Sequence, residues 1–432
     1  MRKDIATNDQ WGFLSFSESR GHMHVLSPNG FAETDPAHVI ANGGAQLMNA
    51  KVYEERYSNP DAGQIIGLNE YATTAVMLAY SRPSDTLVYA PNGHGDRSAV
   101  FKRIANSYAR YGIEVARNYQ EVELIDDIQV DPPLIPNIIS PTIAAYFGEN
   151  GHADPNVRYY NKHIHQRLWE ETGVPTPMTG YVDRSHQMSI ERALQAAGDW
   201  KSYVINTVDG SGGYGIHFAD KSEVGRIITS LMGDRNNDVV QIQGYIPLKS
   251  SPCIIGNLSD SGIEILLASE QYFKTPGAHS GNFWDKEMLQ RLKQYEDDYQ
   301  RAFATLWEEG VRSQINIDLL IPEVPTIGSD GNLHDVLARE VNIRPAGSSV
   351  LLRQQDATLR NDGSPDIIHT VSSTRVLDPD MIEHINDSTQ KNLGIILYNY
   401  IETSQSASLA FLGNDICPDD FVKFKNDSLK RL

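Results

Sequence analysis

The fold is decided by residues 337–349, which read Leu-Ala-Arg-Glu-Val-Asn-Ile-Arg-Pro-Ala-Gly-Ser-Ser. Apolar Val341 and Ile343 alternate with polar Glu340, Asn342 and Arg344, and this period of two predicts a strand. The three polar side chains would share one face in a row roughly 13 Å long, at about 3.3 Å per residue. Two oxygen donors followed by a bidentate anion binder suit a divalent metal beside a phosphate or carboxylate. A solvated strand face would show the same alternation.

The length of the chain indicates how many domains it can form, and its charge indicates which partners it can bind. Its 432 residues are enough for two or three domains with sizeable cores. The formal net charge of −19 argues against nucleic acid or an anionic membrane as a partner. A small anion needs only a local cluster of donors and is not excluded.

The cysteines and the apolar runs bear on the compartment. Cys253 and Cys417 are isolated and give neither a metal spacing nor a disulfide framework, which fits a reducing compartment. The first residues lack the apolar run of a signal peptide, and no window approaches 18 uninterrupted apolar residues. We therefore expect a cytoplasmic protein.

The first third of the chain has the order of an open α/β sheet. Helices are predicted at 68–80 and 97–111, and strands at 24–26, 38–40, 86–90, 113–116, 138–139 and 143–147. His94 and Asp96 follow the strand at 86–90 and would suit a ligand, although a plain glycine-rich turn explains that loop more simply. A glycine-rich and polar stretch at 148–155 suggests a domain boundary.

A second glycine-rich segment follows a strand predicted at 203–206. Residues 209–216 read Asp-Gly-Ser-Gly-Gly-Tyr-Gly-Ile, and the glycines would let backbone N–H groups close around an anion. The segment is not a Walker loop, because no Gly-Lys-Ser/Thr follows. It is not a dinucleotide fingerprint, because 216–219 reads as extended chain rather than a helix. A loop without a ligand stays an alternative to a phosphate-covering loop.

The remaining elements surround the opening stretch. Helices are predicted at 160–173, 188–198, 221–232 and 286–309, a loop at 274–284, and strands at 239–247, 253–258, 263–269, 314–321, 394–398 and 407–411. The strand at 314–321 would place Asp318 beside Glu340 in a hairpin-like pair, close enough to share a metal. His279, Asn282 and Trp284 in the predicted loop are candidates for a substrate pocket. His369 and His384 are interpreted as structural or surface residues.

Together these motifs resemble the ATP-grasp superfamily of carboxylate–amine ligases, closest to peptide or amino-acid ligases with a preceding α/β domain. The resemblance covers about 156–352. It rests on Lys162 in a helix before Gly-Val-Pro-Thr-Pro, the glycine loop, Gln243-Gly-Tyr-Ile-Pro, Asp318, and Glu340-x-Asn342-x-Arg344. It implies an ATP-grasp fold in two lobes, with residues 1–155 as the preceding domain, 156–250 as the N-lobe, and 251–432 as the C-lobe with a C-terminal extension.

The resemblance also implies how ATP would be held. Lys162 would contact the phosphates, and the glycine loop would close over the β- and γ-phosphates through Gly210, Ser211, Gly212, Gly213, Tyr214 and Gly215. The backbone at Gln243, Gly244 and Ile246 would receive the adenine. Asp318, Glu340 and Asn342 would hold Mg²⁺, or alternatively Mn²⁺. Arg344 would hold the substrate carboxylate or the acyl phosphate.

Two positions depart from the family pattern. Asn206 stands where most members place a second lysine, and the loss of that charge would weaken ATP binding or catalysis by a few kcal/mol. Lys249 and Lys274 are candidates to replace it. Ser250 stands where an acid usually binds the ribose, and a hydroxyl can still hydrogen-bond there.

The implied activity joins a carboxylic acid, such as an amino acid or a related small acid, to an amine. Attack of the carboxylate on the γ-phosphate makes an acyl phosphate, which the amine displaces, releasing ADP and phosphate. The protein mainly positions the reactants and neutralises charge. A nucleotide-binding protein without ligation, acting as a sensor or partner subunit, is the first alternative. A carboxylate–thiol ligase acting on a carrier protein is the second. A homodimer is an expectation from relatives.

Overall fold

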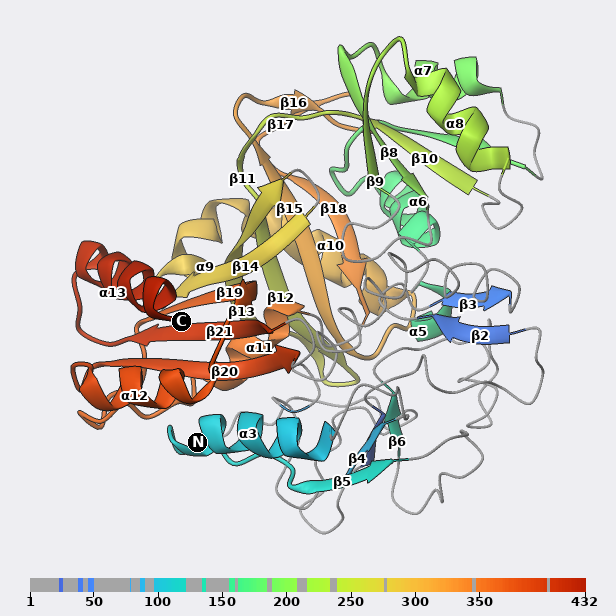
Figure 1. The fold of residues 1–432 in the computed structure, drawn as a ribbon. Helices are drawn as coiled ribbons and strands as arrows, with labels where there is room; N and C mark the ends of the chain where they lie inside the picture. The colour runs from blue at the N-terminus through green and yellow to red at the C-terminus, as the bar shows by residue number, and fades with distance from the viewer. Residues whose placement is uncertain are drawn as a thin grey trace.

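The protein is described by a computed structural model, shown as a ribbon in Figure 1. The structure describes residues 23–25, 38–41, 46–49, 78, 86–89, 97–121, 134–136, 155–159, 162–184, 189–207, 216–233, 239–275, 278–343, 347–401 and 405–432. In these ranges, no helix is long and apolar enough to cross a membrane. The helix predicted at 68–80, except for residue 78, lies outside the described residues. So do the 91–96 loop with His94 and Asp96, the strands at 138–139 and 143–147, the boundary stretch at 148–154, the glycine loop at 210–215, and Arg344.

The first strands form a parallel sheet, and helix α3 connects two of them. Its order is β5-β4-β1-β6, and all its pairings are parallel. The elements are β1 (Met23–Val25), β4 (Thr86–Tyr89), α3 (Arg97–Ala109), β5 (Asn118–Glu121) and β6 (Leu134–Pro136), with a separate hairpin of β2 (His38–Ala41) and β3 (Gln46–Asn49). The β4-α3-β5 order is the expected strand–helix–strand unit, since parallel neighbours need a crossover.

The second sheet is antiparallel and is covered on one face by two helices (Figure 1). Its order is β7-β10-β8-β9. Its elements are β7 (Thr179–Asp183), α7 (Ile190–Ala197), β8 (Ser202–Thr207), β9 (Ile216–Asp220), α8 (Val224–Gly233) and β10 (Val239–Gly244). Ser189 caps α7, accepting a hydrogen bond from Arg192 N–H, which is the preferred chemistry at a helix start. We call this unit the N-lobe.

The third sheet has nine strands and forms the centre of the molecule. Its order is β11-β15-β12-β13-β14-β19-β21-β20, with β18 paired to β15. The strands are β11 (Leu248–Ser250), β12 (Pro252–Ser259), β13 (Gly262–Thr275), β14 (Ala278–Asp285), β15 (Gln314–Pro322), β18 (Leu337–Asn342), β19 (Ile367–Arg375), β20 (Leu393–Ile401) and β21 (Ser406–Gly413). A small hairpin of β16 (Thr326–Ile327) and β17 (Leu333–His334) joins β15 to β18.

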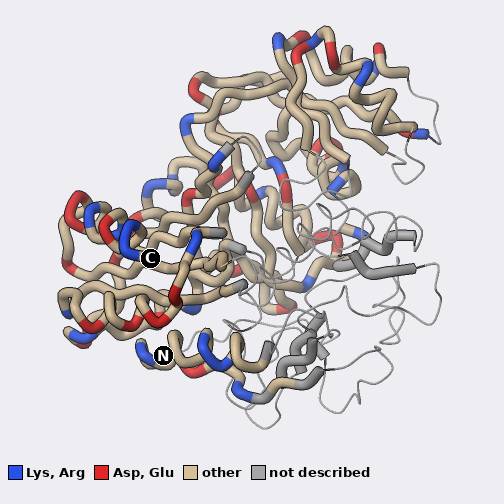
Figure 2. The backbone as a smooth tube through the Cα atoms, viewed as in Figure 1, with Lys and Arg blue, Asp and Glu red and all other residues tan. Residues whose placement is uncertain are grey.

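Helices cover this sheet and enclose two large cores. They are α5 (Pro155–Arg158), α6 (Lys162–Thr172), α9 (Met288–Arg291), η4 (Leu292–Tyr295), α10 (Glu296–Glu308), η5 (Gly347–Ser349), α11 (Val350–Gln354), α12 (Asp380–Ser388) and α13 (Pro418–Arg431). One core joins α6 and α10 to β12, β15 and β18. The other joins α3 to α11, α12 and β19–β21. Figure 2 shows acidic residues on α12, and Asp together with Lys and Arg along α13, so this side carries both charges.

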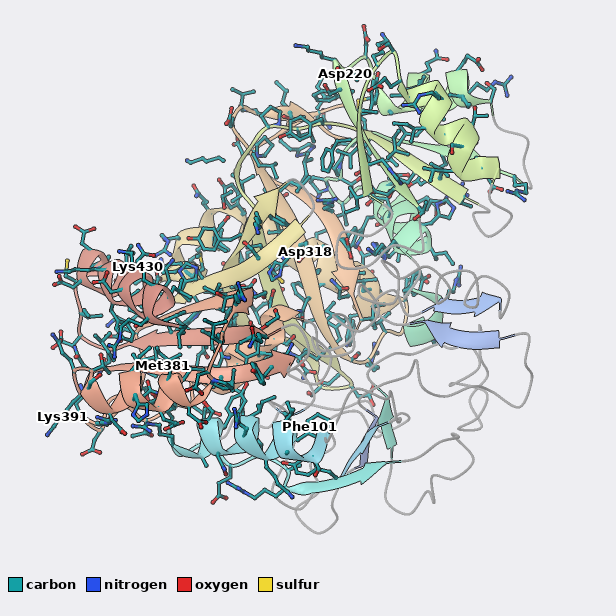
Figure 3. The ribbon with its side chains drawn as sticks, in the orientation of Figure 1. Phe101, Asp220, Asp318, Met381, Lys391 and Lys430 are labelled. Atoms are coloured by element: carbon teal, nitrogen blue, oxygen red, sulfur yellow. The ribbon has the colours of Figure 1, made fainter. Side chains whose placement is uncertain are left out.

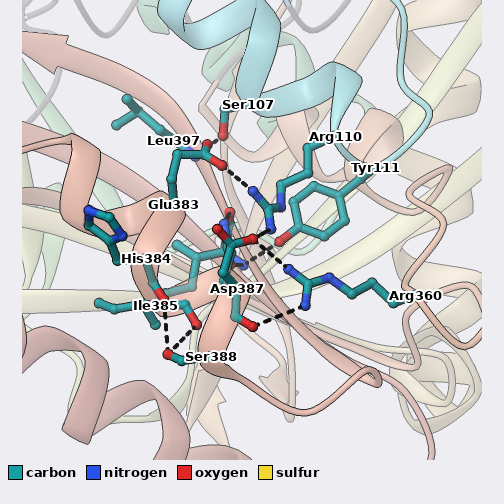
Figure 4. Close-up of polar contacts among 12 residues, drawn as sticks. Ser107, Arg110, Tyr111, Arg360, Glu383, His384, Ile385, Asp387, Ser388 and Leu397 are labelled. Atoms are coloured by element: carbon teal, nitrogen blue, oxygen red, sulfur yellow. Dashed lines mark hydrogen bonds and ion pairs between the residues drawn. The ribbon is translucent and has the colours of Figure 1, made fainter.

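Helix α3 covers the free edge of the central sheet at β20 (Figures 1 and 4). Leu397 N–H donates to Ser107 Oγ at 2.8 Å, and Ile395 N–H donates to Tyr111 Oη at 3.0 Å. Residues four apart on a helix and two apart on a strand are both about 6 Å apart, so the two hydroxyls match two successive edge amides. An edge strand otherwise presents unpaired backbone groups to other chains.

Three sequence predictions were wrong. Residues 113–116 are not a strand; their apolar side chains pack in the core beside α3, and pairing begins only at Asn118. Residues 278–285 are the strand β14 rather than a loop, because they pair with both β13 and β19. The helix predicted at 286–309 is interrupted by a 3₁₀ turn, η4. The acidic run that begins at Glu296 starts a new helix, as acidic residues near a helix N-terminus favour.

Candidate functional site at the interface of the N-lobe and the central sheet

The inner face of the N-lobe sheet is polar by simple alternation. On β8, Tyr203 and Ile205 are buried under the lobe's helices, so Asn206 points to the opposite face. On β10, Val240 and Ile242 are buried in the same core. Asn206 pairs directly with Gln241, and Gln243 donates to Thr179 Oγ1 at 3.1 Å. The Oδ1 atom of Asn206 is shielded from solvent without a hydrogen-bond partner in the described part of the chain.

This polar face lies opposite β18 and α6 across a cavity that is partly open to solvent. Its lining consists of Lys162, Asn206, Thr207, Ile216, Gln241, Gln243, Arg339 and Glu340. Four residues predicted from the sequence, Lys162, Asn206, Gln243 and Glu340, therefore meet at one place although they come from four different elements.

Lys162 and Glu340 form an ion pair at the base of this cavity. Their Nζ and Oε1 atoms are 2.8 Å apart, and α6 packs against β18. Burial acts to raise the pKa of Glu340, but the Lys162 ammonium outweighs it and holds that pKa below its ordinary value. Glu340 is therefore ionised at neutral pH, and Lys162 neutralises it.

Asp318 and Glu340 face each other across β15 and β18, as the sequence predicted. Figure 3 shows Asp318 in the middle of the molecule on the central sheet. Burial, followed by the negative charge of Glu340, raises the pKa of Asp318 to about 7. Gln271 donates to Asp318 Oδ1 at 3.0 Å, and Cys253 hydrogen-bonds to the same side chain. Two partly buried carboxylates side by side are a site where a cation would relieve repulsion.

The donor set fits a hard divalent cation such as Mg²⁺. Asn342 lies two residues beyond Glu340 and pairs with Asn316 across the ladder. The proposed ligands would be carboxylate and amide oxygens, the type that Mg²⁺ prefers. Within the described ranges, no three His, Cys, Asp or Glu side chains group to hold a metal. A cation here would consequently need the Asn342 amide or ligand oxygens in addition to Asp318 and Glu340.

The hinge between the lobes is held by packing. A Cβ atom on Gly244 would lie 2.2 Å from Cε2 of Trp200, so only glycine fits against that ring. Ile246 is buried with Leu320 and Leu337, which ties the hinge to the start of β18. These contacts place the predicted adenine-binding backbone next to the strand that carries Glu340.

Ser250 contacts a carboxylate that sequence reasoning missed. Its hydroxyl donates to Glu270 Oε2 at 2.6 Å, and Ser251 N–H donates to Oε1 at 2.7 Å. An acid is thus present beside the predicted ribose position, supplied by β13 instead of the hinge. Glu270 lies among alternating residues of a strand, and no local motif marks it.

Other predicted residues lie elsewhere. Lys249 and Lys274 are exposed and are not part of the cavity lining, so the structure does not bring them to Asn206. Asn282 is buried and accepts a hydrogen bond from Ser348 Oγ at 2.9 Å. Trp284 packs against both large cores. The glycine loop and Arg344 are outside the described residues. Arg339 and Gln241 line the cavity without having been predicted.

Solved structures similar to this one share its architecture across nearly the whole chain. N5-carboxyaminoimidazole synthetase from Staphylococcus aureus, complexed with ADP, is 10% identical, with 96% of this chain and 99% of that chain covered at a TM-score of 0.52. L-amino acid ligase from Bacillus licheniformis is 10% identical, with 95% and 97% covered at a TM-score of 0.52. Biotin carboxylase from Campylobacter jejuni, as a β-γ-ATP complex, is 10% identical, with 84% and 89% covered at a TM-score of 0.52. No family model and no curated protein matches the sequence. Identities this low establish the fold alone.

Proposed function

We propose that this chain, which has the ATP-grasp fold, is an ATP-dependent ligase that joins a carboxylic acid to an amine. An amino acid or a related small acid is the proposed acyl donor. The observation that carries the proposal is the cavity between the lobes, where Lys162 and Glu340 from the central body meet Asn206 and Gln243 from the N-lobe. The similar structures of N5-carboxyaminoimidazole synthetase and biotin carboxylase are an ADP complex and a β-γ-ATP complex, which supports a nucleotide as the ligand.

The proposed chemistry uses charge and position. The carboxylate attacks the γ-phosphate of ATP, forming an acyl phosphate and ADP, and the amine then displaces phosphate to form the amide. Lys162 would trade its contact with Glu340 for a phosphate oxygen, and Arg344 would orient the carboxylate. Mg²⁺ held by Asp318, Glu340 and Asn342 would neutralise phosphate charge when bound. Such positioning and electrostatics supply most of the catalysis in phosphoryl transfer.

ADP release in the presence of paired acids and amines tests this proposal. Purified protein is screened with Mg²⁺ and ATP, and products are identified by mass. In the Glu340→Gln variant we expect ADP formation to fall by about 100-fold or more, as for loss of a charge-stabilising group. Glu308→Gln, an exposed position on α10, is the matched control and should keep full activity. Equal turnover in the two variants would remove Glu340 from the site.

One observation favours a second candidate, a nucleotide-binding protein without ligation. Asn206 is neutral at a position that faces the cavity, so one phosphate-facing charge of the pattern is absent. Saturable ATP binding without ADP release for any acid and amine pair would support this candidate over the ligase.

A further inference from the structure

Arg339 occupies a β-bulge next to Glu340. Asp318 pairs with Glu340, but Leu319 pairs with Ala338, so two steps along β18 match one step along β15 and Arg339 is the extra residue. Neighbouring residues of a regular strand point to opposite faces. A bulge bends the strand and redirects a side chain, and bulges are frequent beside active sites.

The bulge explains how adjacent residues reach one cavity. Arg339 and Glu340 both line the space below the N-lobe sheet. A regular strand would have sent the Arg339 side chain to the other face, away from Asn206. The guanidinium also lowers the pKa of both Asp318 and Glu340, so its charge is felt where the carboxylates meet.

Two cations, Lys162 and Arg339, are part of the described cavity lining, and they differ in their close contacts. Lys162 is paired with Glu340, and Asn206 and Gln241 are neutral. In the ranges that the structure describes, the Arg339 side chain has no close ion pair or hydrogen bond, and it acts on Asp318 and Glu340 through the longer-range charge interaction noted above. A guanidinium presents a planar fork of donors that matches phosphate oxygens and keeps its charge at every accessible pH. Such a fork in a cavity lined by polar side chains is suited to an anion.

We propose that Arg339 binds the terminal phosphates of the nucleotide and supplies the positive charge that is missing at Asn206. This inference rests on the proposed function, because it takes the cavity ligand to be ATP. In this proposal the positive charge that replaces the missing lysine comes from the central sheet instead of the N-lobe. Neither Lys249 nor Lys274 supplies it. The bulge in β18 allows the Arg339 side chain to reach the cavity from the central sheet.

Nucleotide affinity as a function of phosphate number tests the assignment. Calorimetry compares AMP, ADP and ATP, each with Mg²⁺, on wild type and Arg339→Met. We expect affinity for ATP to fall about 10- to 100-fold, the loss typical of a charge-assisted contact, and affinity for AMP to change less than about threefold. Arg339→Lys keeps the charge but not the fork and should fall between. Arg226→Met, at an exposed site on α8, should match wild type.

Restoring the charge from the other lobe provides the second arm. Asn206→Lys combined with Arg339→Met should recover most of the lost ATP affinity, whereas a purely structural role of Arg339 would not be rescued this way. Unchanged ATP affinity in Arg339→Met, or equal losses for AMP and ATP, would overturn the inference while leaving the proposed function intact. If wild type binds no nucleotide, the proposed function fails and this assignment fails with it. Thermal unfolding of each variant identifies a folding defect. If Arg339→Met is defective in folding, the ATP and AMP affinities of Arg339→Lys are compared with those of wild type instead.

Discussion

The charge state and the proposed role of each residue at this site depend on the residues that face it. Glu340 would be an ordinary exposed carboxylate on an isolated strand. Lys162 from α6 keeps it ionised, and Asp318 from β15 makes it half of a pair that favours a cation. The alternation around Val341 and Ile343 was enough to predict that pairing. It could not predict Arg339, because a bulge has no signature in an apolar–polar pattern.

A histidine far from the cavity gives a prediction at the same scale. His369 on β19 stacks on Tyr272 with ring centroids 5.1 Å apart, and Lys425 Nζ lies 3.2 Å from its Nδ1. Burial, and next the Lys425 charge, lowers the pKa of His369 to about 4. The unfolded chain, with a pKa of about 6.5, therefore binds more protons between these values. The stabilisation is complete above about pH 6.5 and is lost as pH falls towards 4.

The variant His369→Gln cannot take up that proton. Because the ring is only partly buried, we discount the shift and expect about 1 kcal/mol. Melting temperatures at pH 7.5 and pH 5 are the measurement. Between pH 7.5 and pH 5, the free energy of unfolding of the variant should fall by about 1 kcal/mol less than that of wild type. His384→Gln, on α12, is the control. Parallel losses in wild type and His369→Gln would contradict the assignment.

Elements are joined by matching spacings, and the contact of α3 with β20 is the clearest case (Figure 4). Beside the two hydroxyl contacts, Arg110 forms ion pairs with Glu383 and Asp387 of α12. Partly exposed ion pairs contribute little, so the buried amides should matter more.

Removing each hydroxyl tests this ranking. Ser107→Ala leaves Leu397 N–H without its partner and should destabilise the protein by about 1–3 kcal/mol. Tyr111→Phe should cost less, because Asn386 Oδ1 also accepts from Ile395 N–H at 2.9 Å. Chemical denaturation with a probe in α12 measures both. A larger effect of Arg110→Met than of Ser107→Ala would reverse the ranking.

Two glycines of the N-lobe differ in the space around them, so replacing each by alanine should have opposite effects on stability. A Cβ atom on Gly180 of β7 would lie 1.8 Å from the Ala193 carbonyl oxygen of α7, whereas a Cβ on Gly225 of α8 would meet nothing within 4 Å. Gly180→Ala must move backbone and should destabilise the lobe by about 1–3 kcal/mol or more. Gly225→Ala should stabilise it by up to about 1 kcal/mol. Thermal melts distinguish them, and a tolerated Gly180→Ala would show that α7 can shift.

At the scale of the whole molecule, the order of motifs predicted more than any single motif. The strand containing Asp318, the strand β10 that precedes the predicted hinge, and the helix of Lys162 were each correctly predicted as elements. The predictions for 113–116 and 278–285 were wrong because long-range packing determines the structure of both segments. The apolar side chains of 113–116 belong to a core shared with β20 and α12. Residues 278–285 form a strand because they pair with a neighbouring strand on each side. Local pattern carries no information about such distant neighbours.

A ligand in the cavity should stabilise both halves of the molecule at once, because β8 and β10 line it from one side and β18 from the other. At 100 times its dissociation constant, a ligand stabilises the state it binds by about 2.7 kcal/mol, or about 100-fold in opening equilibrium. With Mg²⁺ and ADP, hydrogen exchange should therefore slow together in β8, β10 and β18, and stay unchanged in α12 at the far side of the sheet (Figure 1). Protection confined to the N-lobe would mean that the nucleotide contacts only one wall. In that case Lys162 and Glu340 would retain their mutual ion pair, and the carboxylates of the central sheet would lose their proposed link to phosphate.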